Sequence, residues 1–186
     1  MPTPHRLAAA LCTAGFLSAS GLASAASDIV ISQIYGGGGN VYGADYVELF
    51  NRSSNPVDVS GWSVQYASAT GTGNFSGNGV AALNGTLQPG QYLLVRLAAT
   101  AGGSALPAAD ATGSSNLALA NGKVVLANVA TGLACNGSST PCTPAQSAQI
   151  VDLVGYGTAN FKEGASTAPA ASATTALFRA AAGCTD

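Results

Sequence analysis

Short segments in which apolar and polar residues alternate recur along the chain, separated by residues that favour turns. Val47 and Leu49 point to one face of an extended segment and Glu48 to the other, because successive side chains of a strand alternate. Segments of this kind cover residues 28–35, 46–50, 61–66, 92–97, 117–119, 123–126, 150–156 and 174–179. Many short strands between turns rich in Gly, Pro and Asn predict an all-β sandwich or barrel.

Local turn signals refine this prediction. Asn121-Gly122 lies between two apolar segments, a pattern that predicts a β-hairpin joining residues 117–119 to residues 123–126. The glycines from Gly36 to Gly39 predict a flexible turn, because the Gly-Lys-Ser/Thr sequence of a phosphate-binding loop is missing. Residues 165–176 are rich in alanine, but their proline, serine and threonine content favours a loop over a helix.

Residues 1–25 have the features of a signal peptide. His5 and Arg6 precede an apolar stretch over residues 7–17, and Ala23-Ser24-Ala25 is a small-x-small cleavage pattern. The apolar stretch is shorter than the roughly 20 residues that span a bilayer. We therefore expect cleavage near Ala25 and a mature domain of residues 26–186, secreted to an extracellular or periplasmic space without membrane attachment. A signal-anchor helix is the alternative interpretation.

The expected export determines how the cysteines are interpreted. Cys135 and Cys142 flank a loop of Gly, Ser, Thr and Pro, and in an oxidising compartment they predict a disulfide, with two free thiols as the alternative. Cys184 is then left over in the mature chain. An odd cysteine in an exported protein indicates a partner in a further segment or in a second chain.

The charge and histidine content exclude several kinds of function. Of six Lys and Arg residues one is Arg6, so five basic side chains remain in the mature domain against eight acidic ones, and the five are widely spaced. We expect weak, salt-sensitive DNA binding at most, because strong binding needs clustered cations. The one histidine is His5, so the mature domain lacks the imidazole of catalytic triads and common zinc sites. We expect no catalytic residue and no zinc site.

Pairs of carboxylates give little evidence for a catalytic site either. Asp45 and Glu48 are the closest pair, but their odd spacing puts them on opposite faces of the predicted strand, which is unsuited to joint acid–base work. We expect Asp45 in the loop that enters the strand. The other acidic residues that stand apart are expected to be solvated or to form turns: Asp28, Asp58, Asp110, Asp152 and Glu163.

Two groups of aromatic residues are candidates for binding. Tyr35, Asn40, Tyr42 and Asp45 surround the glycine turn and form a possible polar and aromatic ligand surface. Asp45 and nearby carbonyl groups are possible ligands of a calcium ion, although the spaced acidic loop of an EF-hand is missing. We expect no other cofactor.

The second group is Trp62 and Tyr66, which share one face of a predicted strand with Val64. Their aromatic rings allow a sugar-stacking platform, but packing in the core is the favoured interpretation.

Five segments, taken together and in order, resemble the lamin tail domain family. They are Ile29 to Tyr35, Asp45 to Asn51, Val57 to Val64, Leu87 to Tyr92 and Val151 to Gly157. The most specific part is Val-Glu-Leu-Phe-Asn followed by Ser-Gly-Trp-Ser. The resemblance implies an immunoglobulin-like β-sandwich. Bacterial members similar to this chain carry a signal peptide and often precede a nuclease or phosphatase domain, whose catalytic residues lie outside the lamin tail portion.

These observations predict a secreted, non-catalytic binding or tethering module, accessory to an exported enzyme. Its expected partner is an extracellular protein, a glycan or a surface. Two alternatives remain open, because the fold does not determine the function. The chain is either the substrate-contacting N-terminal part of a secreted nuclease or phosphatase, or a structural spacer without a ligand.

Overall fold

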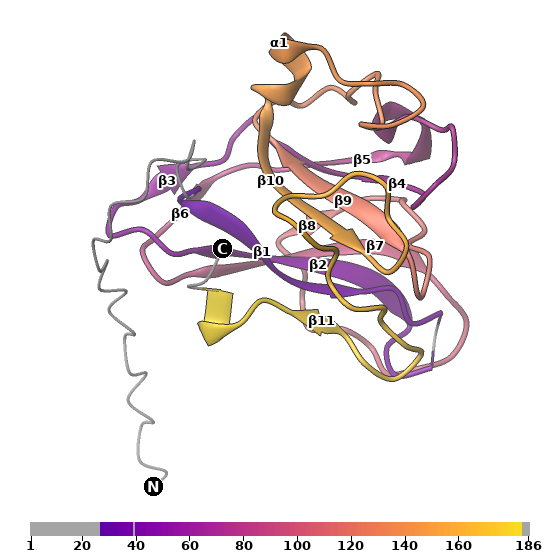
Figure 1. Cartoon of the computed structure of the whole chain (residues 1–186). Helices are drawn as coiled ribbons and strands as arrows, with labels where there is room; N and C mark the ends of the chain where they lie inside the picture. The colour runs from indigo at the N-terminus through magenta and orange to yellow at the C-terminus, as the bar shows by residue number, and fades with distance from the viewer. Residues whose placement is uncertain (1–26, 39, 184–186) are drawn as a thin grey trace, which may run out of the picture.

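Two β-sheets packed face to face make up most of the molecule (Figure 1). This computed structural model describes residues 27–38 and 40–183. The predicted leader and cleavage site, as well as Cys184, lie outside the described residues. Within the described ranges, none of the helices has the length and apolar character needed to cross a membrane.

The first sheet has five strands in the order β11-β1-β2-β7-β8. Neighbouring strands are antiparallel except β7 and β8, which are parallel. Its members are β1 (Ile29–Tyr35), β2 (Ala44–Asn51), β7 (Tyr92–Ala99), β8 (Ala111–Thr112) and β11 (Leu177–Phe178).

The second sheet has four antiparallel strands in the order β10-β9-β4-β5. Its members are β4 (Ser63–Ala67), β5 (Val80–Ala82), β9 (Gly122–Ala127) and β10 (Ile150–Tyr156). A separate two-stranded ribbon pairs β3 (Val57–Asp58) with β6 (Thr86–Leu87). The short helices are η1 (Phe75–Asn78), α1 (Pro144–Ser147) and η2 (Ala181–Gly183).

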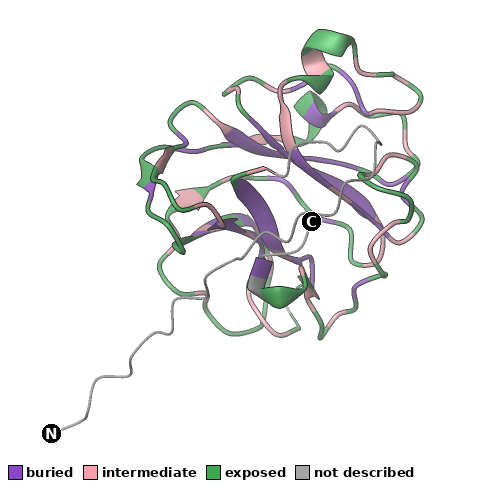
Figure 2. Ribbon diagram, turned by 60° about the vertical axis from the view of Figure 1, so that its left-hand side comes forward, coloured by how far each residue is buried: buried purple, intermediate pink, exposed green. Residues whose placement is uncertain are grey.

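The main core lies between the two sheets, and the alternation of side chains along each strand explains its composition. Ile29, Ile31, Val47 and Leu49 of the first sheet are buried in the same apolar cluster as strand residues of the second sheet, among them Val124. Figure 2 shows the buried central strands of both sheets. Complete burial of one such side chain contributes about 1.5–3 kcal/mol, so this layer is the main source of stability.

The second sheet is buried on its other face as well, which explains why all residues of β9 are buried. Phe75, Leu133 and Cys135 cover Val125 and Ala127 there. The chain between Cys135 and α1 is fixed by the disulfide from Cys135 to Cys142. At the start of α1 the Thr143 hydroxyl accepts from Gln146 N, and the Gln146 side chain accepts from Thr143 N, a reciprocal cap.

These findings confirm the all-β, immunoglobulin-like sandwich and the predicted disulfide. Trp62 is partly buried against the core and Tyr66 lies within it, as the core interpretation expects. Residues 165–176 contain no helix, as expected from their composition.

The hairpin predicted at Asn121-Gly122 is wrong. Residues 117–119 form no strand, and β9 pairs instead with β4 and β10. Leu117 enters the core, while Ala118 receives a hydrogen bond from the Tyr156 hydroxyl and donates one to the Tyr66 hydroxyl. These tertiary contacts carry residues 113–121, the crossover segment, from the first sheet to the second and override the local turn signal.

Two expectations about acidic residues are also wrong. Asp45 lies within β2 and is only 1% exposed, rather than in a loop that enters the strand. Asp152 is 2% exposed, rather than solvated or part of a turn. The burial of each carboxylate is offset by hydrogen bonds from backbone N–H groups, partners that the sequence does not mark.

Candidate functional site

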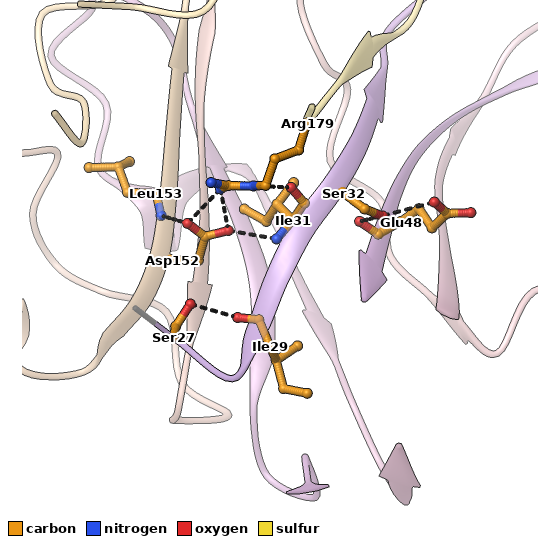
Figure 3. Close-up of polar contacts among 8 residues, drawn as sticks. All are labelled: Ser27, Ile29, Ile31, Ser32, Glu48, Asp152, Leu153 and Arg179. Carbon is orange, nitrogen blue, oxygen red and sulfur yellow. Dashed lines mark hydrogen bonds and ion pairs between the residues drawn. The ribbon is translucent and has the colours of Figure 1, made fainter. Parts of the chain in front are cut away.

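The edge of the sandwich formed by β1, β10 and β11 holds an unusual cluster of polar contacts around Asp152. The pairing of β10 with β9 shifts register between Ile150 and Asp152, and that of β1 with β2 shifts between Ile31 and Gln33. The Asp152 carboxylate accepts from Ile31 N at 2.6 Å and from Leu153 N at 3.0 Å (Figure 3). One carboxylate therefore joins the two sheets where both strands are irregular.

Arg179, which directly follows β11, completes this cluster. Its Nη2 donates to both carboxylate oxygens of Asp152 at 2.8 Å, and its Nε donates to Ile31 O at 3.0 Å (Figure 3). Its backbone N–H also donates to Ser32 O at 2.9 Å. The side chains of Arg179 and Asp152 are 14% and 0% exposed. The ion pair thus fastens the C-terminal segment to both sheets.

Beside this ion pair, a cleft of about 230 Å³ opens between the edge strands of the two sheets. Apolar residues that belong to or pack against the core form much of its lining: Ile31, Ile34, Leu153, Val154 and Leu177. Phe178 also lines the cleft and is 72% exposed, the highest value among the exposed large apolar side chains of the described residues. We call this feature the edge cleft.

Polar side chains complete the edge cleft. Gln33, Glu163 and Ser166 contribute to its lining together with the Arg179 side chain. An apolar floor with a few polar groups around it is typical of sites that bind small molecules or side chains, rather than of a flat solvated surface.

Several carboxylates of the described residues are placed for structural hydrogen bonding. Asp152 is paired with Arg179, Glu48 accepts from the Ser32 hydroxyl at 2.8 Å, and Asp110 accepts from Leu94 N at 2.8 Å. No group of three or more His, Cys, Asp or Glu residues that could hold a metal occurs in the part of the chain that the structure describes.

The predicted ligand surface of Tyr35, Asn40, Tyr42 and Asp45 is only partly open. The Tyr35 ring stacks on the Tyr46 ring with centroids 5.4 Å apart, and the Tyr42 ring meets both edge-on. Tyr35 and Asp45 are 2% and 1% exposed, whereas Asn40 is exposed and Tyr42 is half-buried. As a ligand surface the group stays a prediction, reduced to Asn40 and Tyr42.

The hydroxyl groups of this cluster organise the glycine turn. The Tyr35 hydroxyl accepts from Val41 N at 3.1 Å and donates to Ala173 O at 3.2 Å. Tyr46 accepts a hydrogen bond from Gln33, and burial raises its pKa to about 12. The tyrosines therefore hold two loops against the outer face of the first sheet.

Asp45 supports the crossover segment from the core side. Its Oδ2 accepts from Leu117 N at 2.8 Å. Burial raises the pKa of Asp45, and backbone hydrogen bonds from Leu117 and Gly38 oppose that rise in part. Calcium binding at Asp45 stays a prediction, with this carboxylate and nearby carbonyl groups as its suggested ligands.

Lys123 is a buried charge that sequence reasoning missed. It is 0% exposed, and its Nζ donates to Asn136 O at 2.9 Å and to Asn160 Oδ1 at 3.0 Å. Burial lowers its pKa. The sequence places Lys123 on the same strand face as Val125, but only the structure shows that the loop with the disulfide covers this face. Lys123 ties two loops together.

The comparisons with known proteins agree with this architecture. A search of the curated proteins finds no match to the chain. The family model described as Lamin Tail Domain matches residues 23–158, which include β1 to β10. Glu163, Phe178 and Arg179, which line the edge cleft, follow the matched range. Since the match covers most of the sequence, the chain belongs to the lamin tail domain family.

Proposed function

We propose that this chain is a secreted, non-catalytic binding module that acts as an accessory to an exported enzyme. The observation that carries the proposal is the edge cleft, where the exposed Phe178 ring stands beside an apolar recess of about 230 Å³. One exposed apolar side chain is ordinary by itself, but an exposed ring beside an apolar recess that polar side chains surround is typical of a binding site. Glycans of an extracellular surface are the partner class that we favour.

The chemistry of the cleft supports a glycan. Sugar rings present an apolar face of C–H groups, which packs on aromatic rings such as that of Phe178. Their hydroxyl groups need donors and acceptors, and the amide of Gln33, the carboxylate of Glu163 and the hydroxyl of Ser166 line the same cleft. The edge cleft therefore offers both kinds of contact within one small site.

Other observations support export and the lack of catalysis. The disulfide from Cys135 to Cys142 suits an oxidising compartment, in agreement with the leader-like residues 1–25. The mature domain has no histidine, and the buried carboxylate of Asp152 is committed to an arginine and to backbone N–H groups. A module of this kind attaches or positions an enzyme and leaves the reaction to another domain.

The test is a retention experiment with the purified mature domain, residues 26–186. Insoluble cell-wall glycan, soluble polysaccharides and double-stranded DNA serve as separate probes. We expect retention on a glycan and a loss of about tenfold or more in affinity for Phe178→Ser, because an aromatic anchor in a pocket carries much of the binding energy. Leu119→Ser is the matched control, since Leu119 is 40% exposed and does not line the cleft.

Three results would contradict the proposal. Retention on none of the probes would favour a structural spacer, and equal losses for both variants would remove the edge cleft from the argument. Sub-micromolar DNA binding at physiological salt would favour the substrate-contacting part of a nuclease instead. We expect DNA binding to be weak and to vanish as salt rises, since the five cations of the mature domain are scattered.

A further inference from the structure

The turn that joins β5 to β6 places two reactive groups around one hydroxyl. Asn84 and Gly85 form this turn, and both are exposed. Gly85 N donates to the Ser60 Oγ at 3.1 Å, and the same Ser60 Oγ donates to Asn84 Oδ1 at 3.0 Å. The Ser60 hydroxyl therefore bridges the backbone nitrogen of Gly85 and the side-chain carbonyl of Asn84.

These two groups are the nucleophile and the electrophile of one intramolecular reaction. The backbone nitrogen after an asparagine can attack the side-chain carbonyl carbon, and a following glycine removes the steric obstacle of a side chain. A hydroxyl both accepts and donates a hydrogen bond, so it can take the proton of the attacking nitrogen and give its own to the carbonyl oxygen. Ser60 is placed for both transfers, and the Asp58 carboxylate, whose pKa is lowered by a hydrogen bond with the Ser60 side chain, competes with Asn84 Oδ1 for the Ser60 proton.

We propose that Asn84 is a self-modification site, at which Ser60 assists conversion of the side chain through a cyclic imide to aspartate and isoaspartate. Gly85 N forms a bond with Asn84 Cγ, and its proton passes to the Ser60 Oγ while the Ser60 proton passes to Oδ1. The bond from Cγ to the amide nitrogen then breaks, and ammonia leaves with the returned proton. Water opens the imide at either carbonyl group, so atoms and charges balance without an oxidant or a cofactor.

Three local features keep this constellation in place and accessible. Asp58 accepts from Ser60 N at 2.9 Å, and Val59 N donates to Gly85 O at 2.9 Å, so the two turns of the β3–β6 ribbon are fixed against each other. Gly85 has a φ of 99°, a conformation that favours glycine, and there is open space where a Cβ would lie. Water therefore reaches the imide once it forms.

The other Asn-Gly steps of the described residues differ in their surroundings. Asn136 is 0% exposed, and its side chain is held by several hydrogen bonds, among them those with Ser139 and Thr140. Buried Gly122 follows Asn121 as the first residue of β9, so its nitrogen lacks the freedom of a turn. Asn78 is the last residue of η1, and its amide nitrogen donates to Tyr66 O at 3.1 Å.

The chemical consequence is a new negative charge in the ribbon turn. Conversion of Asn84 adds a carboxylate close to Ser60 and Asp58, in a mature domain that already has more acidic than basic residues. Isoaspartate also adds a methylene group to the backbone of the turn. The negative charge of this turn therefore increases with the age of the protein.

The experiment follows all four Asn-Gly steps in the purified mature domain during incubation at physiological temperature and mildly alkaline pH. Peptide mapping by mass spectrometry separates asparagine, aspartate and isoaspartate. We expect Asn84 to convert first, with Asn136 unchanged while the protein is folded. General acid–base assistance contributes about 10² or more in rate at well-formed sites, so we expect Ser60→Ala to slow Asn84 by about tenfold at this exposed one.

A matched variant separates proton transfer from simple support of the turn. Ser60→Thr keeps a hydroxyl group and should retain most of the rate at Asn84. If Ser60 acted only as a brace, Ser60→Ala would loosen the turn and leave the rate equal or higher. That result, or an Asn84 rate no higher than those of Asn78 and Asn121, would overturn the proposal.

Discussion

Asp152 and Asp45 are both buried carboxylates that hold a crossing segment, but among the described residues a cation lies beside Asp152 and none beside Asp45. Asp152 accepts from backbone N–H groups of β1 and β10 and is paired with Arg179 at 2.8 Å. Asp45 accepts from Leu117 N at 2.8 Å, and its charge adds to the burial that raises the pKa of Tyr66 and Tyr156. A buried aspartate therefore holds a segment in two ways, with an ion pair at Asp152 and with a backbone hydrogen bond at Asp45.

The difference shows what each segment needs. The only strand of the described C-terminal segment is β11, which is two residues long and pairs with one strand. The segment therefore depends on the Arg179 ion pair for attachment. The crossover segment is already held by the core packing of Leu117 and by the hydroxyl groups that contact Ala118. A buried charge without a cation is tolerated at Asp45 because other contacts supply the stability there.

The largest expected effect comes from breaking the ion pair at Asp152. Arg179→Met leaves a buried carboxylate without its cation, which costs about 3–5 kcal/mol in the free energy of unfolding. Urea denaturation near neutral pH measures the loss. Because β11 also forms a wall of the edge cleft, the variant should bind less glycan as well. A loss below about 1 kcal/mol would show that the ion pair is not what fastens the segment.

A second variant tests whether charge or hydrogen bonding dominates at this edge. Adding Asp152→Asn to Arg179→Met removes the unpaired charge, while the amide oxygen at position 152 keeps one acceptor for the N–H groups of Ile31 and Leu153. We expect the double variant to lose about 1–3 kcal/mol relative to the wild type, less than Arg179→Met loses by itself. Equal losses in the two proteins would place the cost in packing instead of charge.

The neutral contacts of the crossover segment should each matter less. Tyr156→Phe removes the hydroxyl that donates to Ala118 O at 2.7 Å and leaves the ring in the core. We expect a loss of about 1 kcal/mol in the free energy of unfolding, typical of one buried neutral hydrogen bond. Tyr46→Phe is a control from the outer face of the first sheet. If Tyr156→Phe lowered the free energy of unfolding as much as Arg179→Met does, the contrast between the two segments would be contradicted.

The sequence predicted the parts of this fold that depend on local patterns. β1, β2 and β10 follow from apolar alternation, and the disulfide from Cys135 to Cys142 follows from a short loop and the expected compartment. The hairpin at Asn121-Gly122 failed because long-range hydrogen bonds to Ala118 outweigh a local turn preference. Alternation reports the faces of a strand, but not the partners of the segments between strands.

The candidate site was beyond such patterns. Asp152 and Arg179 are 27 residues apart in the chain, and the register shifts that bring the Asp152 carboxylate to Ile31 N leave no mark in the sequence. Phe178 was assigned to a final strand, but its 72% exposure depends on the edge position of β11. Tyr35 and Asp45 were predicted near the same turn, and only the structure shows that both are buried.

The smallest expected effect, and one of opposite sign, comes from neutralising Asp45. Burial raises the pKa of Asp45 above its usual value of 3.8, so its contribution to stability is complete below that value and is lost as pH rises through the pKa of the folded state. Asp45→Asn keeps an oxygen acceptor for Leu117 N but carries no charge. Relative to the wild type, the variant should therefore gain stability as the pH is raised from about 4 to about 7, because only the wild type must give up the proton that its raised pKa favours. Urea denaturation of both proteins across this range measures the difference. Parallel stability curves for the two proteins would mean that the Asp45 carboxylate is as well accommodated as that of Asp152, and the contrast between the two aspartates would then disappear.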